Sequence, residues 1–175
     1  MFKYIFYFIL FPSITHAQKT AYFNEKVVLN AIPDYERKLK ETDSIRKSYV
    51  LRIKNMNEKL KAKTFKLIKP YNITGDITEE ELLSILSEKD KGRFEIILQE
   101  QKLNNTIAQT LDKEMQIIYQ EKVGVLIDEA YDVIKDYCEN NKIDVLYKLE
   151  AFENSIGYIN EKLDITIILQ EAVSK

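Results

Sequence analysis

The sequence predicts a mainly α protein with a small β body, an α+β fold in which a long antiparallel coiled-coil hairpin arm projects from a strand-rich body. Three observations lead to this prediction. Two long stretches, at 34–68 and 93–140, carry helical spacing of apolar residues. A segment rich in turn-forming residues, KPYNITGD at 69–76, separates them. Short strand-like runs lie before the first of these stretches, at 20–23, and after the second, at 143–147 and 156–159.

Residues 1–17 have the pattern of a signal peptide. Lys3 supplies a positive start, an apolar run follows from Tyr4 to Ile14, and Thr15-His16-Ala17 forms a small-x-small cleavage site. The run is shorter than the ~20 apolar residues that a membrane-spanning helix needs. We therefore expect cleavage before Gln18 and export across the inner membrane.

The composition excludes many kinds of catalysis. The chain has 175 residues, one His, one Cys and a net charge of −2. Removal of the signal peptide also removes His16, so Ser-His-Asp catalysis, Cys-His catalysis and His-ligated metal sites are excluded. The four glycines are too far apart for a phosphate-binding loop. The near-zero net charge gives no global basic field, so we do not expect nucleic acid as a partner. We expect no enzyme, no metal and no cofactor.

The first half of the mature chain is read as strand, short helix and long helix. Thr20–Phe23 favours a strand, and Asn24 is a suitable N-cap for a helix over 25–32 that Pro33 ends. The long helix over 34–68 contains no Gly or Pro. Steps of four and three place these residues in one seam: Tyr35, Leu39, Thr42, Arg46, Tyr49, Ile53, Met56, Leu60, Lys63 and Leu67.

The far end of the arm, about 70–90, is expected to be a bent tip. Thr78-Glu79-Glu80-Glu81 is a capping box that starts a short helix. Asp90-Lys91-Gly92 is expected to break or bend the chain before a second long helix begins at Arg93.

The second long helix changes the phase of its apolar seam once. The seam first follows Ile97, Gln101, Asn104, Ala108, Leu111, Met115 and Ile118. It then moves by one residue to Tyr119, Val123, Leu126, Ala130, Val133 and Tyr137, all of which are apolar or aromatic. Because polar residues interrupt only the earlier part, the half of the hairpin near the tip should be less tightly sealed than the half near the body.

The C-terminal segment predicts two strands and a helix. The strand-like runs are 143–147 and 156–159, and Asp164 caps a final helix with one apolar face. The predicted organisation is a signal peptide at 1–17, a body of 18–33 with 141–175, and an arm of 34–140. So small a body should need partner chains to complete its sheet and cover its edges.

The chain resembles the Skp/OmpH family of periplasmic chaperones. The resemblance rests on the signal peptide, the early AYFN strand leading to NAIPDY, the long hairpin, and the closing YINEKLDIT at 158–166. It implies a homotrimer in the periplasm, whose strands form a central barrel and whose hairpins surround a cavity. It also implies an ATP-independent holdase that binds unfolded outer-membrane proteins and takes part in their assembly.

Charge is distributed unevenly along the hairpin. Between residues 52 and 69 there is one acidic residue, Glu58. The same segment contains a basic stripe of Arg52, Lys54, Lys59, Lys61, Lys63, Lys66 and Lys69. Across the turn, the charged residues of 76–90 are six acids and one lysine. The two strips could neutralise one another across the hairpin, or the basic stripe could meet anionic clients, anionic lipid or lipopolysaccharide.

Several apolar residues lie outside both seams and are the candidate client-binding residues. They are Val50, Leu51, Phe65, Ile68, Ile96 and Leu103. In a two-helix arm such side chains would face water, which is typical of an interaction surface, unless a bent tip covers them. Cys138, on the last turn of the second long helix, fits a small core residue better than a redox thiol.

Three other kinds of protein share some of these sequence features. A secreted structural or adaptor coiled coil that joins fixed envelope partners would share the heptads without requiring the strand-rich ends. A membrane-inserting hairpin would need ~18 consecutive apolar residues, which the mature chain lacks. Prefoldin-like chaperones share the hairpin but are cytosolic, which conflicts with a signal peptide.

Overall fold

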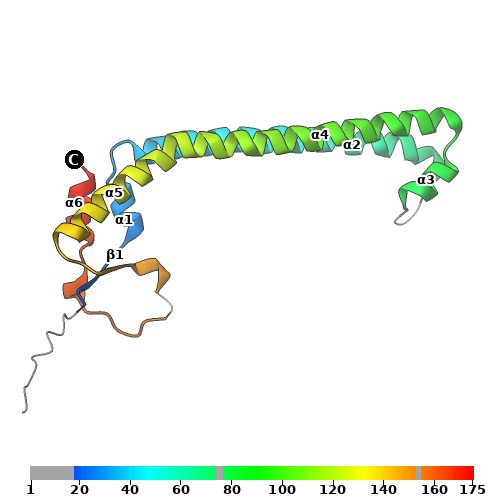
Figure 1. Cartoon of the computed structure of the whole chain (residues 1–175). Coiled ribbons are helices and arrows are strands. Elements are labelled where there is room, and N and C mark those ends of the chain that lie inside the picture. Colours follow the sequence, from blue (N-terminus) through cyan, green and yellow to red (C-terminus); the bar gives the residue numbers. More distant parts are fainter. Residues whose placement is uncertain (1–17, 74–76, 153–154) are drawn as a thin grey trace, which may run out of the picture. The chain divides into compact units, whose positions relative to one another are not determined.

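The structure is a computed structural model, and it describes residues 18–73, 77–152 and 155–175. These residues form two compact units: residues 34–129, and the residues before 34 together with 130–175. The predicted signal peptide lies outside the described residues. The prediction of a mainly helical chain with a small sheet is confirmed (Figure 1).

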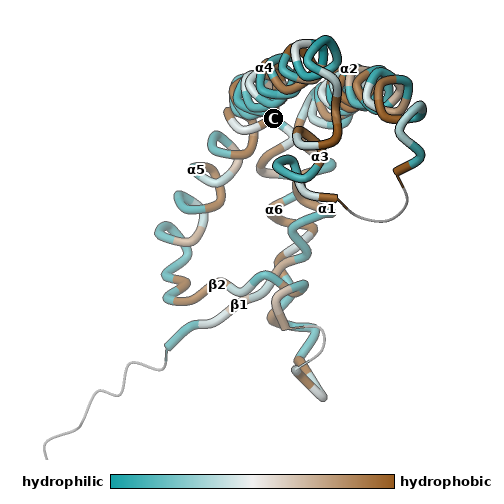
Figure 2. The backbone as a smooth tube through the Cα atoms, turned by 90° about the vertical axis from the view of Figure 1, so that its right-hand side faces the viewer, coloured by the Kyte–Doolittle hydropathy of each residue, from teal (hydrophilic) through white to brown (hydrophobic). Residues whose placement is uncertain are grey.

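The unit of residues 34–129 is a hairpin of two long helices. Helix α2, Tyr35–Ile68, and helix α4, Glu88–Tyr119, run side by side in opposite directions (Figure 1). Apolar residues recur along both helices between polar ones (Figure 2). Each helix thus has an apolar stripe that it can bury only against the other.

Burial along this seam is uneven. Thr42 is fully buried, and its hydroxyl donates to the backbone oxygen of Lys38 at 2.8 Å. Leu111 and Met115 of α4 are also buried. Every side chain of residues 43–68 in α2, by contrast, keeps at least partial exposure. On α2 the seam is therefore tight near residue 42 and loose toward the tip, whereas Ile97 of α4 is buried in the far half.

A π-helical turn, η2, spans Gln120–Gly124 and continues directly into α5, Val125–Asn140. A π turn holds one residue more than an α turn, so it rotates the following apolar stripe by one position. It lies next to the place where the seam changes phase in the sequence. Val123 in this turn is fully buried, and Lys122 forms an ion pair with Glu41 at 3.3 Å.

The tip has a small core of its own. A 3₁₀ turn, η1, spans Lys69–Tyr71, and α3 spans Glu79–Ile85 behind the capping box of Thr78 and Glu81. Leu82, Leu86 and Phe94 are buried together. The partly buried residues around this core are Leu67, Ile68, Tyr71, Ile73, Ile77, Leu83 and Leu98.

The predicted break at Asp90-Lys91-Gly92 is wrong. The chain bends at Leu86, which has an extended backbone, and the next residue, Ser87, caps α4 by accepting from the backbone N–H of Asp90. The Tyr71 hydroxyl donates to Asp90 at 2.7 Å, which fixes this corner. Gly92 lies inside the helix with open space where a Cβ would stand. Side-chain capping by Ser87 decided the boundary, and Gly92 did not.

The second unit is built on a two-stranded parallel sheet. Strand β1, Thr20–Phe23, pairs with β2, Val145–Lys148, in the register that places Tyr22 beside Tyr147. Helix α1, Glu25–Asn30, packs against α6, Thr166–Val173, with Val28 and Leu169 fully buried. Short 3₁₀ turns, η3 at Leu149–Ala151 and η4 at Glu161–Leu163, connect these elements.

The predicted strand at 156–159 is not formed. The second edge of β1 makes only an isolated bridge, from Tyr22 to Asp164. Ile156 and Ile159 line a pocket beside the sheet, and Tyr158 between them is 83% exposed. Residues 156–159 keep the alternating pattern of a strand, but they have no partner strand within the described chain.

Polar contacts join three elements of this unit. The Tyr131 hydroxyl donates a hydrogen bond to Glu25, and Lys148 donates to the same oxygen, Oε1, at 2.7 Å. The Lys148 ammonium also lies 4.8 Å from the centre of the Tyr131 ring. Partial burial opposes the charged form of Glu25, but the hydrogen bonds from Lys148 and Tyr131 outweigh it and hold the pKa of Glu25 below its usual value.

We predict that Glu25→Gln destabilises this unit in a pH-dependent way. A lowered pKa means that ionised Glu25 stabilises the fold above its ordinary pKa of 4.5, and that this stability is lost as the pH falls. The substitution should lower the free energy of unfolding by about 1 kcal/mol at pH 7 and have little effect near pH 3. Urea unfolding at both pH values, at one protein concentration, measures this. Equal effects at both pH values would contradict the assignment.

We also predict that Leu82→Ala opens the tip alone. The change leaves a cavity under α3 that costs about 2–5 kcal/mol, because Leu82 is buried in the small tip core. Hydrogen exchange should show faster exchange over residues 79–86 and unchanged protection around Thr42 and Leu111. Gly92→Ala is the control, since it meets open space and should leave tip exchange unchanged or slower. Loss of protection along the whole hairpin would refute an independent tip core.

Candidate functional site

The candidate site is the far half of the hairpin, where the loose seam leaves a groove on each side. Leu60 lies in the seam and lines both grooves, which share no other residue. The seam contact of two helices cannot cover the flanks of either one. The apolar and polar side chains on these flanks are therefore exposed to solvent.

The first groove, called here the basic groove, combines positive charge with apolar surface. One part has a volume of about 510 Å³ and is lined by Lys59, Lys63 and Leu103, among others. It continues into a part of about 340 Å³ that contains Ile96 and Arg93, because Lys63 and Lys66 line both parts. The one acid that lines it, Glu100, is engaged by Lys63 at 2.6 Å.

The second groove, called here the Phe65 groove, has a different chemistry. It has a volume of about 560 Å³, and Leu60, Phe65 and Ile68 supply its apolar surface. Its other lining residues are Asn57, Lys61, Thr64, Gln101 and Asn105. The hairpin thus offers a cationic apolar face and a largely uncharged one. The described residues that line these grooves include no His, Cys or Ser.

The model of one protein family, described as outer membrane protein (OmpH-like), matches residues 19–171. The chain belongs to the OmpH-like family. Membership suggests a chaperone role connected with outer-membrane proteins, and the proteins of this family are chaperones and not enzymes. No curated protein matches the chain.

In this OmpH-like chain, the six candidate client-binding residues do not form one patch. Val50, Leu51, Phe65, Ile96 and Leu103 are all between 57% and 61% exposed. Leu103 and Ile96 lie in the basic groove, and Phe65 lies in the other groove. Val50 and Leu51 are not among the residues that line these two grooves. Ile68 is half-buried and packs against the tip core, as the alternative reading of these residues expected.

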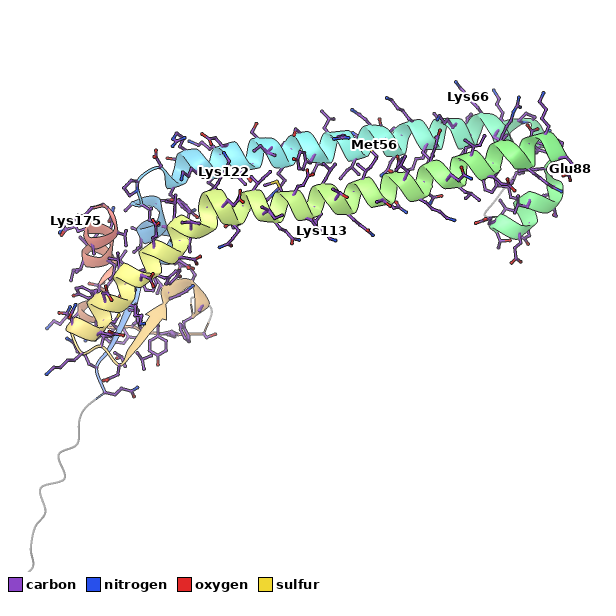
Figure 3. The ribbon with its side chains drawn as sticks, turned by 45° about the horizontal axis from the view of Figure 1, so that its top comes forward. Met56, Lys66, Glu88, Lys113, Lys122 and Lys175 are labelled. Carbon is purple, nitrogen blue, oxygen red and sulfur yellow. The ribbon has the colours of Figure 1, made fainter. Side chains whose placement is uncertain are left out.

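The basic stripe is mostly unneutralised. Lys54 pairs with Glu58 at 3.8 Å and Lys63 pairs with Glu100 at 2.6 Å. The other five members of the stripe have no ion pair within the part of the chain that the structure describes. In the same part, no ion pair joins the stripe to the acids of 76–90. Figure 3 shows Lys66 on α2 and Lys113 on α4 pointing away from the hairpin on opposite sides.

Sequence reasoning missed two features. Arg93 and Met56 both contribute to the basic groove, and neither was among the expected candidates. In the other unit, an apolar pocket of about 390 Å³ is lined by Tyr22, Tyr147 and Phe152 among others, with the last two rings 5.1 Å apart edge to face. The aromatic residues on both strands were the signal that could have indicated this pocket.

Reactive groups are scarce. Over residues 18–73, 77–152 and 155–175, no three His, Cys, Asp or Glu side chains gather as metal ligands would. Cys138 is half-buried, and this burial raises the pKa of its thiol. Because the thiolate is the reactive form, a raised pKa makes Cys138 a weak nucleophile. In the same residues, no helix combines the length and apolar character needed to cross a membrane.

Proposed function

We propose that this protein is a periplasmic, ATP-independent holdase that binds unfolded outer-membrane proteins in a cavity between the helical arms of a homotrimer. The signal peptide at 1–17 would deliver it to the periplasm and be cleaved before Gln18. Membership in the OmpH-like family supports the chaperone role.

One observation carries the holdase proposal: the far half of the hairpin leaves large apolar side chains in water. Phe65 is 61% exposed, Leu103 58% and Ile96 57%, on helices that a second long helix already covers on one side. Isolated apolar residues on a surface are normal, but a repeated series beside grooves is typical of an interaction surface. Unfolded chains offer the matching apolar surface.

Binding of this kind should be weak at each point and strong in sum. Full covering of one such side chain contributes about 1–2 kcal/mol. Several contacts engaged together give avidity without a single dominant residue. The sequence has no phosphate-binding loop, so release would follow from a competing folding reaction of the client.

The small sheet supports the proposal of partner chains. Two four-residue strands form it, and one edge of β2 has no partner strand in the described chain. Tyr158 and Ile167 of the same unit are 83% and 64% exposed. Open strand edges and exposed apolar residues are unfavourable in a soluble monomer. Three copies would cover both the open strand edge and the exposed apolar residues.

The basic stripe would provide a surface for anionic lipid or lipopolysaccharide.

We predict that replacing Val50, Leu51, Phe65 and Leu103 together by Ser weakens client holding and leaves the particle intact. The four side chains are more than half exposed, so their loss should cost little folding free energy. The measurement is suppression of aggregation of an unfolded outer-membrane protein, with the native mass determined on the same sample. Ile117→Ser is the matched control, since Ile117 is equally exposed and lies outside the proposed set.

Unchanged suppression by the quadruple variant would refute the assignment of these residues. Dissociation of the particle would show that these residues hold the copies together. Binding of one folded envelope protein, with no effect on unfolded ones, would favour the adaptor function instead.

A further inference from the structure

The hairpin carries opposite charges on two different sides near its tip. On one side the basic groove presents Lys59 and Lys66, neither of which has an ion pair within the described residues. On α3, the carboxylates of Glu79 and Glu80 are exposed and have no ion pair or hydrogen bond within the same residues. Each surface thus keeps a charge that its own chain does not neutralise.

The two surfaces also match in size and apolar character. Seven helical residues make α3 about 10 Å long, and the rise from Lys59 to Lys66 along α2 is also about 10 Å. Ile85 on α3 is 48% exposed, and Leu103 on the groove is 58% exposed. An acidic segment with an exposed apolar residue is therefore complementary to a basic groove with an apolar floor.

The two surfaces of one chain do not meet. Helix α3 is held by Leu82 and Leu86 against Phe94, in a core that also includes Ile68 of the Phe65 groove. Figure 3 shows Lys66 pointing to the side of the hairpin away from α3. The complementary partner must come from another molecule.

A second copy can supply it at the right height. The core under α3 includes Phe94 and Leu98, and the basic groove extends from Arg93 to Leu103, so both surfaces lie at the same level along α4. Parallel arms related by a rotation axis would place α3 of one copy beside the groove of the next. Such a head-to-tail contact closes when the rotation forms a ring.

We propose that α3 of one copy docks in the basic groove of the neighbouring copy and closes the empty chaperone at its tips. The proposal rests on the homotrimer of the proposed function. Docking would cover Ile96 and Leu103, so an unfolded client would have to displace α3 to reach them. The tip contact is then a gate that client binding opens.

The test uses paired cysteines in a Cys138→Ala background. Glu80→Cys with Lys66→Cys should form disulfides between copies under mild oxidation, because docking brings the two positions together. Glu80→Cys with Lys113→Cys is the control, since Lys113 points away on the opposite side (Figure 3). The first pair should give at least about fivefold more cross-linked dimer and trimer than the control, because docking raises the effective concentration of the two thiols.

Charge and client dependence identify the contact. Cross-linking should fall in about 1 M salt, where screening acts within ~3 Å, and with an excess of unfolded outer-membrane protein. Adding Lys59→Glu should reduce it, and adding Glu79→Lys to that variant should restore it.

Three results would overturn the proposal. They are cross-linking equal to the control, disulfides only within single chains, and no recovery in the charge-swapped variant. Native mass and aggregation suppression, measured on the same samples, separate the two levels. A trimeric holdase without the cross-link refutes only the gate, whereas a monomeric particle refutes the gate and the proposed function together.

Discussion

The contact between α2 and α4 is the constraint on which the hairpin depends. A pair of helices can bury only one stripe on each partner, so the other apolar residues on these helices stay in water unless the tip core covers them. Near Thr42 and Leu111 the stripe is well filled, and toward the tip Lys63 and Gln101 interrupt it. The grooves and the exposed apolar side chains follow directly from this geometry. The proposed activity uses surface that a globular protein would have hidden.

The two ends of this long contact have different local structures. At one end the π turn of Gln120–Gly124 inserts one residue and so rotates the apolar stripe. The residues that follow, including Ala130 and Ile134, are buried in the other unit. At the other end the tip core ties α3 to the hairpin through Phe94. The long helices can therefore stay regular while their two ends meet different surroundings.

The sequence predicted features that depend on local chemistry. The N-cap Asn24, the capping box at Thr78 and the phase change near Tyr119 are encoded within a few residues, and each was found. The sequence prediction placed the start of α4 too late, because the Ser87 cap begins the helix at Glu88 and the helix tolerates Gly92 in its first turns. The strand at 156–159 was wrong because pairing depends on a distant segment, which periodicity does not reveal. The two groove chemistries needed the register between α2 and α4, which only the folded hairpin defines.

In the proposed function, the loose half of the hairpin is the part that receives unfolded chains. Hydrogen exchange of the native particle, with and without an unfolded outer-membrane protein, measures this directly. We predict that free α2 exchanges faster over residues 50–68 than around Thr42, because no side chain of residues 50–68 is buried. Addition of the client should slow exchange over 50–68 and 96–103 and leave the region of Thr42, Leu111 and Met115 unchanged. Uniform protection along α2 in the free protein, or slowing confined to the sheet-containing unit, would contradict it.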